Sequence, residues 1–333
     1  MPTSDPLWIT EADVVGAIDL SGAVGAVRDA LRLEHAGTAT TLAKTATEFG
    51  GHGTLHSLGG AGVSSDGGDV VGTKSWAHTQ GGATPLVTLW DAESGALLAV
   101  IEAFALGQMR TAAVSAIATD VMAALDAAVF AMVGTGKQAL AQVAAVASQR
   151  ELRQVRVYSP TADHRAAFCG QVGQRLPDVA VVDCLDVRSA VEGADVVTTA
   201  TRSRTSILDA TMVGAHTHVN ALGSITNDRR ELDDSIVVAA GRIVSDSPAA
   251  ARSLSSEFYQ AAEVLSLSAV VAEPVGGADR SGPSIFKAMG LGLADVAIAA
   301  AVLSTTRSTG GGRPMPAPTR AAPQLFSTLE VTS

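Results

Sequence analysis

This 333-residue chain is organised around Ala131-Met132-Val133-Gly134-Thr135-Gly136-Lys137-Gln138-Ala139, a glycine-rich turn between an apolar strand and an alanine-rich helix. Gly134 allows a tight turn, Gly136 lets the backbone approach a phosphate pair, and the small Ala139 permits close packing of helix on strand. Free N–H groups and the positive end of the helix dipole near Lys137 favour an anion here. The segment therefore predicts a dinucleotide pyrophosphate site. A tight strand–helix turn without a ligand is the alternative.

The sequence after this turn has the alternating pattern of an α/β domain. Short β-branched runs alternate with helical segments from Asp126 to about Val244, which predicts a doubly wound parallel sheet of the Rossmann type. The expected strands are Val129–Val133, Val155–Tyr158, Val179–Val182, Val196–Thr199, His218–Leu222 and either Ile236–Ala240 or Arg242–Ser245.

The sequence before the turn predicts an α+β domain. A helix is expected from Asp19 to Ala36, capped by Asp19 or Ser21. Strands are expected at Thr41–Phe49, Gly53–Leu58 and Asp69–Ala77, and a hairpin is expected from Thr84–Trp90 and Ala96–Glu102. The apolar run Leu86–Trp90 resembles an open sheet edge that needs covering, which predicts a homodimer through this domain.

These sequence patterns divide the chain into two domains and a tail. Residues 1–118 with 284–306 form the α+β substrate and dimerisation domain, residues 119–283 form the Rossmann domain, and residues 307–333 form a flexible tail rich in glycine and proline. A late helix is expected from Ser284 to Leu303. Its apolar part, Ala288 to Leu303, contains Asp295, which indicates a buried helix rather than a membrane span.

Composition argues against several other classes of protein. The formal net charge is −10 and no basic cluster is present, so no nucleic-acid partner is expected. Two cysteines are too few for a disulfide framework, and the N-terminus lacks a basic region followed by an apolar run, which together favour the cytoplasm. His52, His56 and His78 lack compact metal-binding spacing, so no metal is expected.

Two cations stand in apolar surroundings. Lys74 lies inside an otherwise apolar strand, where an ammonium needs a partner. Arg110 begins a very apolar helix, and a guanidinium binds a carboxylate through two parallel hydrogen bonds. The pair predicts a clamp for the carboxylate of an α-imino or α-amino acid, with Cα facing a nicotinamide. A snorkelling lysine and an interdomain ion pair are the alternative.

Several motifs of the chain together resemble those of the ornithine cyclodeaminase/mu-crystallin family. They are Arg110–Thr119 (RTAAVSAIAT), Gly134–Ala139 (GTGKQA), Asn220–Ser224 (NALGS), Arg230–Asp233 (RELD), Asp246–Pro248 (DSP) and Ile285–Gly290 (IFKAMG). The resemblance implies a dimerising α/β domain, completed by the C-terminal segment, and a Rossmann domain. It also implies reversible hydride transfer between NAD(P) and the α-carbon of an amino or imino acid.

The resemblance also implies roles for single residues. Lys74 and Arg110 match positions that bind the substrate carboxylate, and Lys44 falls near a third. His56 stands where ornithine cyclodeaminases hold the distal amine with a glutamate, and a neutral imidazole is a poorer partner for an ammonium. Ile225 replaces their acid–base aspartate and transfers no proton. These departures favour the mu-crystallin branch, which reduces cyclic ketimines.

The end of the second Rossmann strand indicates the choice of cofactor. The strand Val155–Tyr158 leads into Ser159, Pro160 and Thr161, with no carboxylate at its tip to accept from the ribose hydroxyls. Ser159 and Thr161 are expected to donate to a 2′-phosphate and Arg165 to add charge, so NADP is preferred and NAD is the alternative. In that alternative, Asp163 or a water serves the ribose.

The full set of expected cofactor contacts follows from the same motifs and strand ends. It comprises Thr111, Gly134, Thr135, Gly136, Lys137, Gln138, Ser159, Thr161, Arg165, Ala200, Thr201, Ala221 and Gly223. Arg202 and Arg204 are expected either at the cofactor phosphates or in solvent, and Trp76 and Trp90 in the core or at the dimer interface.

Three functions are therefore weighed. The first is an NAD(P)H-dependent oxidoreductase acting on the C=N or CH–NH bond of an imino or amino acid, either as a ketimine reductase or as an amino acid dehydrogenase. The second is a cyclodeaminase-type lyase that uses NAD internally, and the third is a non-catalytic, crystallin-like nucleotide-binding protein. The charged pair of Lys74 and Arg110 serves no purpose in the third.

Overall fold

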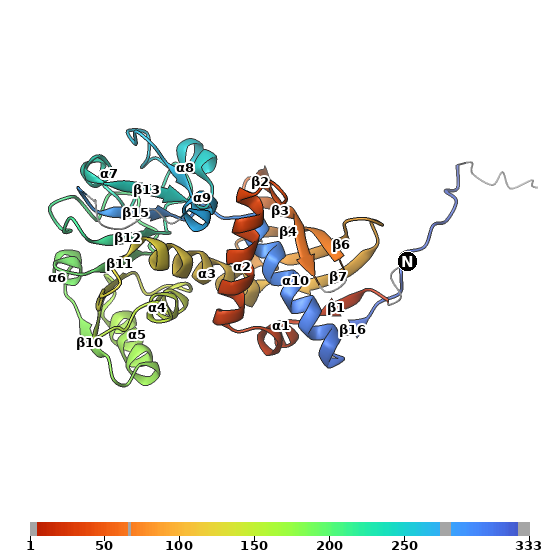
Figure 1. The fold of residues 1–333 in the computed structure, drawn as a ribbon, viewed down its shortest axis with the longest axis horizontal. Helices are drawn as coiled ribbons and strands as arrows, with labels where there is room; N and C mark the ends of the chain where they lie inside the picture. Colours follow the sequence, from red (N-terminus) through yellow and green to blue (C-terminus); the bar gives the residue numbers. More distant parts are fainter. Residues whose placement is uncertain (1–4, 66–67, 274–280, 326–333) are drawn as a thin grey trace, which may run out of the picture.

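The computed structural model describes residues 5–65, 68–273 and 281–325. Two lobes lie side by side, each built on a sheet that has eight strands within these residues, and α3 (Phe104–Met122) runs between them (Figure 1). α3 packs on α2 of the first lobe and on α4 and β12 of the second. The helix that carries Arg110 therefore joins the two lobes.

The first lobe contains a mixed sheet in the order β16-β1-β7-β6-β4-β3-β2, with β5 paired to β4. Its strands are β1 (Leu7–Ile9), β2 (Thr40–Phe49), β3 (Gly53–Ser65), β4 (Gly68–Thr79), β5 (Gly82–Ala83), β6 (Leu86–Asp91), β7 (Leu97–Glu102) and β16 (Arg313–Pro314). Its helices are α1 (Glu11–Ala17), α2 (Leu20–His35) and α10 (Gly292–Thr309). The expected helix, strands and hairpin all form, and the Asp19 side chain caps α2 by accepting from the Gly22 N–H at 2.8 Å.

The expected open edge was assigned to the wrong strand. β6 lies between β7 and β4, and its Val87 and Leu89 are fully buried. The sheet ends at β16 on one side and at β2 on the other, and β2 carries the exposed Leu42 and Phe49, with Leu55 exposed on the adjacent β3. Interior and edge strands share the same alternating apolar pattern, so the pattern of β6 does not reveal its place in the sheet.

The helix α10 lies close against the first sheet. A Cβ on Gly292 would lie 2.3 Å from the backbone nitrogen of Gly59 on β3, so a side chain at Gly292 has no room. Leu293, Val296 and Ile298 enter the core of the first lobe, and Asp295 is completely buried with them. Of the helices in the described residues, none has the length and apolar character that crossing a bilayer requires.

The second lobe is a Rossmann domain. All pairings in its sheet are parallel, in the order β10-β9-β8-β11-β12-β15-β13-β14. The strands are β8 (Val129–Val133), β9 (Gln154–Tyr158), β10 (Ala180–Asp183), β11 (Val196–Thr199), β12 (His218–Ala221), β13 (Arg242–Ser245), β14 (Leu265–Ser266) and β15 (Ser284–Lys287). The helices are α4 (Ala139–Ala147), α5 (Ala162–Arg175), α6 (Val187–Val191), α7 (Asp234–Ala239), α8 (Pro248–Leu254) and α9 (Leu267–Ala272). The doubly wound sheet predicted from the sequence is confirmed. Of the two segments proposed for the last strand, Arg242–Ser245 is the one that forms a strand.

Two segment assignments near the C-terminus were wrong. Ser284–Lys287 is not the start of a helix but strand β15, between β12 and β13 of the Rossmann sheet, so the chain returns to the first lobe only after Gly290. The expected tail from 307 begins with ordered structure, because α10 runs to Thr309 and β16 pairs with β1. A short buried apolar run has no periodicity that separates strand from helix, which explains the error at Ser284.

Candidate functional site

The glycine turn lies where the strand order of the Rossmann sheet reverses. β8 is followed along the chain by β9 on one side, while β11 pairs with its other side, so a crevice opens at the carboxyl ends of these strands. Gly134 adopts φ +106°, and a Cβ there would lie 2.6 Å from the carbonyl oxygen of Ala200, the residue after β11. Its N–H donates to the carbonyl of Tyr158 on β9 at 2.8 Å. The turn thus joins the tips of three strands.

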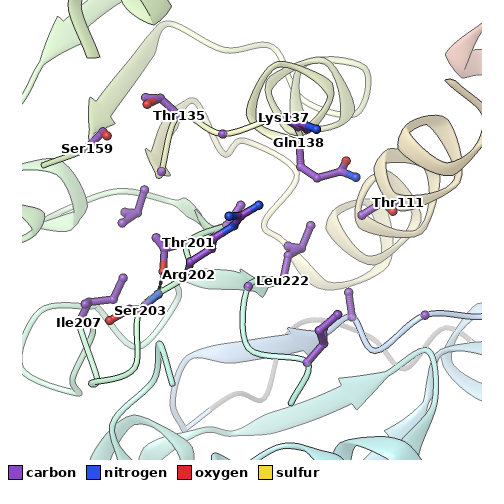
Figure 2. A pocket seen from close by; sticks show the side chains of 18 of the residues that line it. Thr111, Thr135, Lys137, Gln138, Ser159, Thr201, Arg202, Ser203, Ile207 and Leu222 are labelled. Atoms are coloured by element: carbon purple, nitrogen blue, oxygen red, sulfur yellow. Dashed lines mark hydrogen bonds between the residues drawn. The ribbon is translucent and has the colours of Figure 1, made fainter. Parts of the chain in front are cut away.

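A cavity of about 980 Å³ occupies this crevice and extends toward the first lobe. Figure 2 shows Thr135 and Ser159 on one side and Thr111 and Leu222 on the other, with Arg202 extending between them. The lining residues are Lys44, Leu58, Trp76, Arg110, Thr111, Val133, Gly134, Thr135, Gly136, Lys137, Gln138, Tyr158, Ser159, Pro160, His164, Val187, Ala200, Thr201, Arg202, Ser203, Ile207, Leu222, Gly223, Ile225, Ala288, Met289 and Gly290.

The cavity has the features that a dinucleotide requires. α4 begins at the turn, and its N-cap residue Gln138 makes no side-chain capping hydrogen bond, so N–H groups remain available to a phosphate. A Cβ on Gly136 would meet no atom within 4 Å, which leaves the backbone open to a ligand. The described lining contains cations, Lys44, Arg110, Lys137 and Arg202, and no carboxylate. The residues present therefore fit an anionic dinucleotide.

A second cavity of about 810 Å³ adjoins the first on the side of the first lobe. The two share Trp76, Arg110, Thr111, Lys137 and Gln138, whereas Lys74 lines only the second. Arg110 therefore stands at the junction of the two cavities.

Asp295 joins the two predicted cations. Its Oδ1 accepts a hydrogen bond from Lys74 Nζ at 2.8 Å, and its Oδ2 lies 3.4 Å from Arg110 Nε, an ion pair without hydrogen-bond geometry. Burial lowers the pKa of Lys74, and the charge of Asp295 opposes this shift. One carboxylate faces two cations, so the group carries excess positive charge at the junction of the cavities.

Lys44 and Asp246 extend this group. Lys44 lines the first cavity, and burial together with the charge of Arg110 lowers its pKa. Asp246 is buried and accepts from the N–H groups of Met289 and Gly290 at 2.7 and 3.0 Å, just before the chain re-enters the first lobe. Burial raises the pKa of Asp246, and these N–H groups and Arg110 oppose the shift. Asp246 thus fixes the connection beside Arg110.

His56 and Trp76 take unexpected positions. Their rings stack with centroids 4.7 Å apart, and the His56 ring is not part of either cavity lining. Trp76, expected in the core or at the dimer interface, is half-buried and lines both cavities, so it is not a core residue. Ile225 lines the first cavity.

Most of the expected cofactor residues line the first cavity, but three do not. Thr161, Arg165 and Ala221 are outside its lining. Arg165 is buried and donates to the carboxylate of Asp183 and to the backbone carbonyl of Ser159, so its guanidinium is bound within the protein. His164 lines the cavity in its place, and Arg202 does so as well, whereas Arg204 is exposed and pairs with Asp228.

The sequence reasoning missed the acidic residues of the site. Asp295 interrupts an apolar segment, and a carboxylate in such surroundings is the sequence signal for a partner of the isolated Lys74. Asp246, Glu231 and Glu257 are buried as well and were not expected to be. Among the described residues, no three His, Cys, Asp or Glu side chains are grouped to hold a metal ion.

This arrangement defines an NAD(P)-binding α/β protein, in which a Rossmann cavity meets a cationic group held by a second lobe. The chain belongs to the ornithine cyclodeaminase/mu-crystallin family, whose family model matches residues 5–310.

Two curated relatives and one solved structure illustrate the similarity. The ketimine reductase mu-crystallin of Macropus fuliginosus is 32% identical over 224 residues, which are 67% of this chain and 69% of that protein. The Δ1-pyrroline-2-carboxylate reductase of Bacillus cereus is 28% identical over 224 residues, 64% of this chain and 68% of that protein. The iminosuccinate reductase of Paracoccus denitrificans, solved in complex with NAD+, superposes with a TM-score of 0.85 at 25% identity, covering 93% of this chain and 98% of that chain.

Proposed function

We propose that this protein is an NAD(P)H-dependent oxidoreductase that reduces the C=N bond of an α-imino acid and, in reverse, oxidises the CH–NH bond of an α-amino acid. The observation that carries the proposal is the group Lys74–Asp295–Arg110 at the junction of the anion-binding cavity and the second cavity. The names of the relatives describe the same chemistry, the reduction of ketimine, pyrroline-2-carboxylate and iminosuccinate.

The cationic group accounts for binding and orientation. Arg110 and Lys74 hold the substrate carboxylate, and Lys44 adds a third positive charge on the side of the first cavity. The carboxylate neutralises the charge that Asp295 leaves unbalanced. It thereby turns the α-carbon toward the cofactor, and the reduced nicotinamide supplies the hydride when bound. We assign to Lys74, which lines the second cavity, the further role of proton donor to the substrate.

The cavity walls favour a substrate without a distal amine. In the parts of the chain that the structure describes, neither cavity is lined by Asp or Glu, and Ile225, Leu58 and Trp76 supply apolar surface. A distal ammonium, as in ornithine, therefore finds no anionic partner. This supports a cyclic ketimine or another neutral side chain over the cyclodeaminase reaction. The buried cationic group argues equally against a purely nucleotide-binding role.

The preferred cofactor in this proposal is NADPH. No carboxylate of the described residues lines this end of the cavity, which favours a 2′-phosphate, and Ser159 and His164 lie here. Arg165 gives less support than the sequence suggested, because Asp183 and Ser159 already bind its guanidinium. Thr161, next to the lining residue Pro160, keeps its proposed contact with the phosphate. NADH remains the competing cofactor in the titration described below.

A homodimer in the cytoplasm completes the proposal. Leu42, Phe49 and Leu55 expose apolar surface on β2 and β3 at the open edge of the first sheet, which a second copy covers. Light scattering at micromolar concentration is expected to give twice the mass of one chain. Cys169 and Cys184 are free thiols, consistent with a reducing compartment.

A substrate panel tests the activity. Purified protein is mixed with NADPH or NADH and with a cyclic ketimine, an α-keto acid plus amine, or L-ornithine, and absorbance at the nicotinamide band is followed. We expect net oxidation of the cofactor with the ketimine. Release of ammonia from ornithine with trace NAD and no net change in NADH would identify the lyase, and cofactor binding without turnover on any substrate would identify the non-catalytic protein.

A further inference from the structure

A group of buried charges lies directly behind the wall of the first cavity. Glu231, Glu257 and Lys287 expose at most 1% of their surface. Glu231 precedes α7, Glu257 follows α8, and Lys287 ends β15. Lys287 Nζ lies 2.8 Å from Glu257 Oε2, and no member of the group lines either cavity. The reaction proposed above assigns none of them a role.

Glu231 links two loops of the cavity wall. Its Oε1 accepts from the backbone N–H of Thr201 at 2.6 Å, and its Oε2 accepts from the N–H of Gly223 at 2.7 Å. The hydroxyl of Thr199 donates to Oε2 at 2.9 Å. Thr201 follows β11 and Gly223 follows β12, and both line the cavity. A single carboxylate therefore sets the distance between the two loops.

Glu231 and Thr201 pack so closely on Gly223 that no side chain fits at this position. A Cβ on Gly223 would lie 2.4 Å from Glu231 Oε1 and 2.2 Å from the carbonyl oxygen of Thr201. The carboxylate thus packs directly on the backbone of the wall. Because a buried carboxylate binds N–H donors more strongly than a neutral acceptor, its charge matters as well as its shape.

Glu257 and Lys287 hold Glu231 in place. Glu257 Oε1 accepts from the N–H groups of Glu231 and Leu232 at 2.6 and 2.8 Å. Lys287 neutralises Glu257 and immediately precedes Ala288, the first of three successive residues that also line the cavity. The buried group therefore connects the three wall segments that follow β11, β12 and β15.

We propose that Glu231 is a positioning residue for the cofactor: its carboxylate holds the loops at Thr201 and Gly223 in the arrangement that accepts the nicotinamide half. The role rests on the proposed function insofar as the ligand is NAD(P)H. Glu257 and Lys287 act through Glu231, since Glu257 accepts from the N–H groups of Glu231 and Leu232 and Lys287 pairs with Glu257.

The main test replaces Glu231→Gln and compares it with the control Asp233→Asn. Both changes remove one carboxylate from the same short segment, but Asp233 caps α7 through the Ser235 N–H, accepts from the Ser206 hydroxyl and lines neither cavity. An amide offers one acceptor oxygen, so the Glu231→Gln side chain places an N–H against a backbone donor. We expect the Kd of NADPH and NADH, measured by fluorescence titration, to rise at least tenfold in the Glu231→Gln variant and to stay within twofold of wild type in the control.

Hydrogen exchange in the cofactor-free protein gives a second readout. Amides in residues 199–203 and 221–225 are expected to exchange at least tenfold faster in the Glu231→Gln variant, with the strands of the first lobe unchanged. With a substrate that the enzyme converts and with saturating cofactor, we expect the KM of the Glu231→Gln variant for that substrate to stay within threefold of wild type. Its kcat is expected to fall. Unchanged Kd and unchanged exchange in a folded Glu231→Gln protein overturn the proposal.

Two variants with smaller changes, Thr199→Val and Thr198→Val, test the proposal if Glu231→Gln does not fold. Thr199→Val removes one donor to Glu231, while Thr198→Val removes an equally buried hydroxyl that has no hydrogen-bond partner in the described structure. We expect a three- to tenfold rise in the cofactor Kd for Thr199→Val alone. Equal values for the two variants overturn the proposal.

Rescue tests the outer part of the group. Lys287→Met leaves Glu257 buried without a counter-charge and is expected to weaken cofactor binding as Glu231→Gln does. Adding Glu257→Gln removes that charge but keeps an acceptor for the N–H groups of Glu231 and Leu232, and is expected to restore the Kd to within threefold of wild type. Failure of the double variant to recover shows that Lys287 does not act through Glu257. If wild type binds neither cofactor, the proposed function fails, while the exchange measurement still tests Glu231.

Discussion

The ammonium of Lys74 on β4 lies 2.8 Å from the carboxylate of Asp295 on α10, although 221 positions separate the two residues in the sequence. Asp295 is completely buried and also faces Arg110, so it fixes both cations that the proposed reaction requires. Breaking such a pair from one side leaves an uncompensated buried charge, which costs more than the pair contributes when intact.

Removing the shared carboxylate tests this arrangement first. Asp295→Asn leaves Lys74 and Arg110 to repel each other, so we expect a loss of stability of about 3–5 kcal/mol and a fall in kcat/KM of roughly ten- to a hundredfold. The control is Asp29→Asn, which breaks the exposed pair with Arg32 and is expected to cost at most about 1 kcal/mol. Thermal unfolding and steady-state kinetics measure the two effects, and equal losses would remove the special role of Asp295.

Arg110 is expected to dominate binding of the carboxylate. Arg110→Ala should lower kcat/KM by roughly two to four powers of ten, about 3–5 kcal/mol of charged hydrogen bonding. Lys74→Arg separates the roles of Lys74: full activity would confine it to electrostatics, whereas a lost kcat with preserved KM would indicate proton donation. Unchanged kinetics of Arg110→Ala would contradict the proposed clamp.

The pH dependence follows from the two lysines. Burial lowers the pKa of Lys44 and of Lys74, so each loses its proton at a pH below the usual range for lysine. The clamp needs the protonated forms, and kcat/KM is therefore expected to be high at neutral pH and to fall as the pH rises through these lowered values. Lys44→Arg keeps its charge and should move part of the fall to higher pH. A flat profile up to about pH 10, the usual lysine range, would be incompatible with this assignment.

The two glycines of the turn are expected to respond differently. At Gly134, a positive φ and the nearby Ala200 carbonyl make Gly134→Ala destabilising by about 1–3 kcal/mol. A side chain at Gly136 meets no protein atom, so Gly136→Ala should leave the melting temperature unchanged or slightly raised but weaken cofactor binding. Calorimetry and cofactor titration of both variants check this separation; weakened folding without weakened binding at Gly136 would contradict a phosphate at the turn.

Cofactor choice is tested at Ser159. Ser159→Asp places a carboxylate at the tip of β9 and should weaken NADPH binding by about 1–3 kcal/mol, with NADH binding equal or better because the new acid accepts from the ribose hydroxyls. Titrating both cofactors into wild type is simpler. If NADH binds more tightly before any substitution, the preference for NADPH is wrong.

Local patterns predicted most of the Rossmann lobe. The glycine turn and the β-branched runs predicted β8 to β12 to within about one residue at each end and gave β13 as one of two alternatives, because a parallel strand buried on both faces is apolar throughout and is followed by a helix. Local patterns failed at Ser284–Lys287, because a short apolar run is equally consistent with a strand and with a helix. They also failed at β6, because the sequence of a strand does not show which strands lie beside it in the sheet.

The site was predictable only where residues carry an energetic anomaly. A lysine in an apolar strand and an arginine in an apolar helix pointed to the clamp, although that helix begins at Phe104 and not at Arg110 as expected. The glycine motif pointed to the turn. Their partners Asp295 and Asp246 lie on elements far away in the sequence, so only the packing of α10 and β13 reveals them. Arg165 shows the opposite error. The sequence placed this cation near a strand tip and predicted that it binds the cofactor, but it binds Asp183 instead.

The place of α10 in the chain has a consequence for biosynthesis. The first lobe is completed by a helix that the ribosome makes only after the whole Rossmann lobe, so Lys74 stays without its counter-charge throughout most of translation. The Rossmann lobe can form as a unit meanwhile, whereas the sheet of the first lobe keeps an uncovered apolar face until Gly292–Thr309 docks on it. Any chain cut short before this helix would therefore carry a finished nucleotide lobe beside a sheet prone to aggregation, and activity would appear only in full-length molecules.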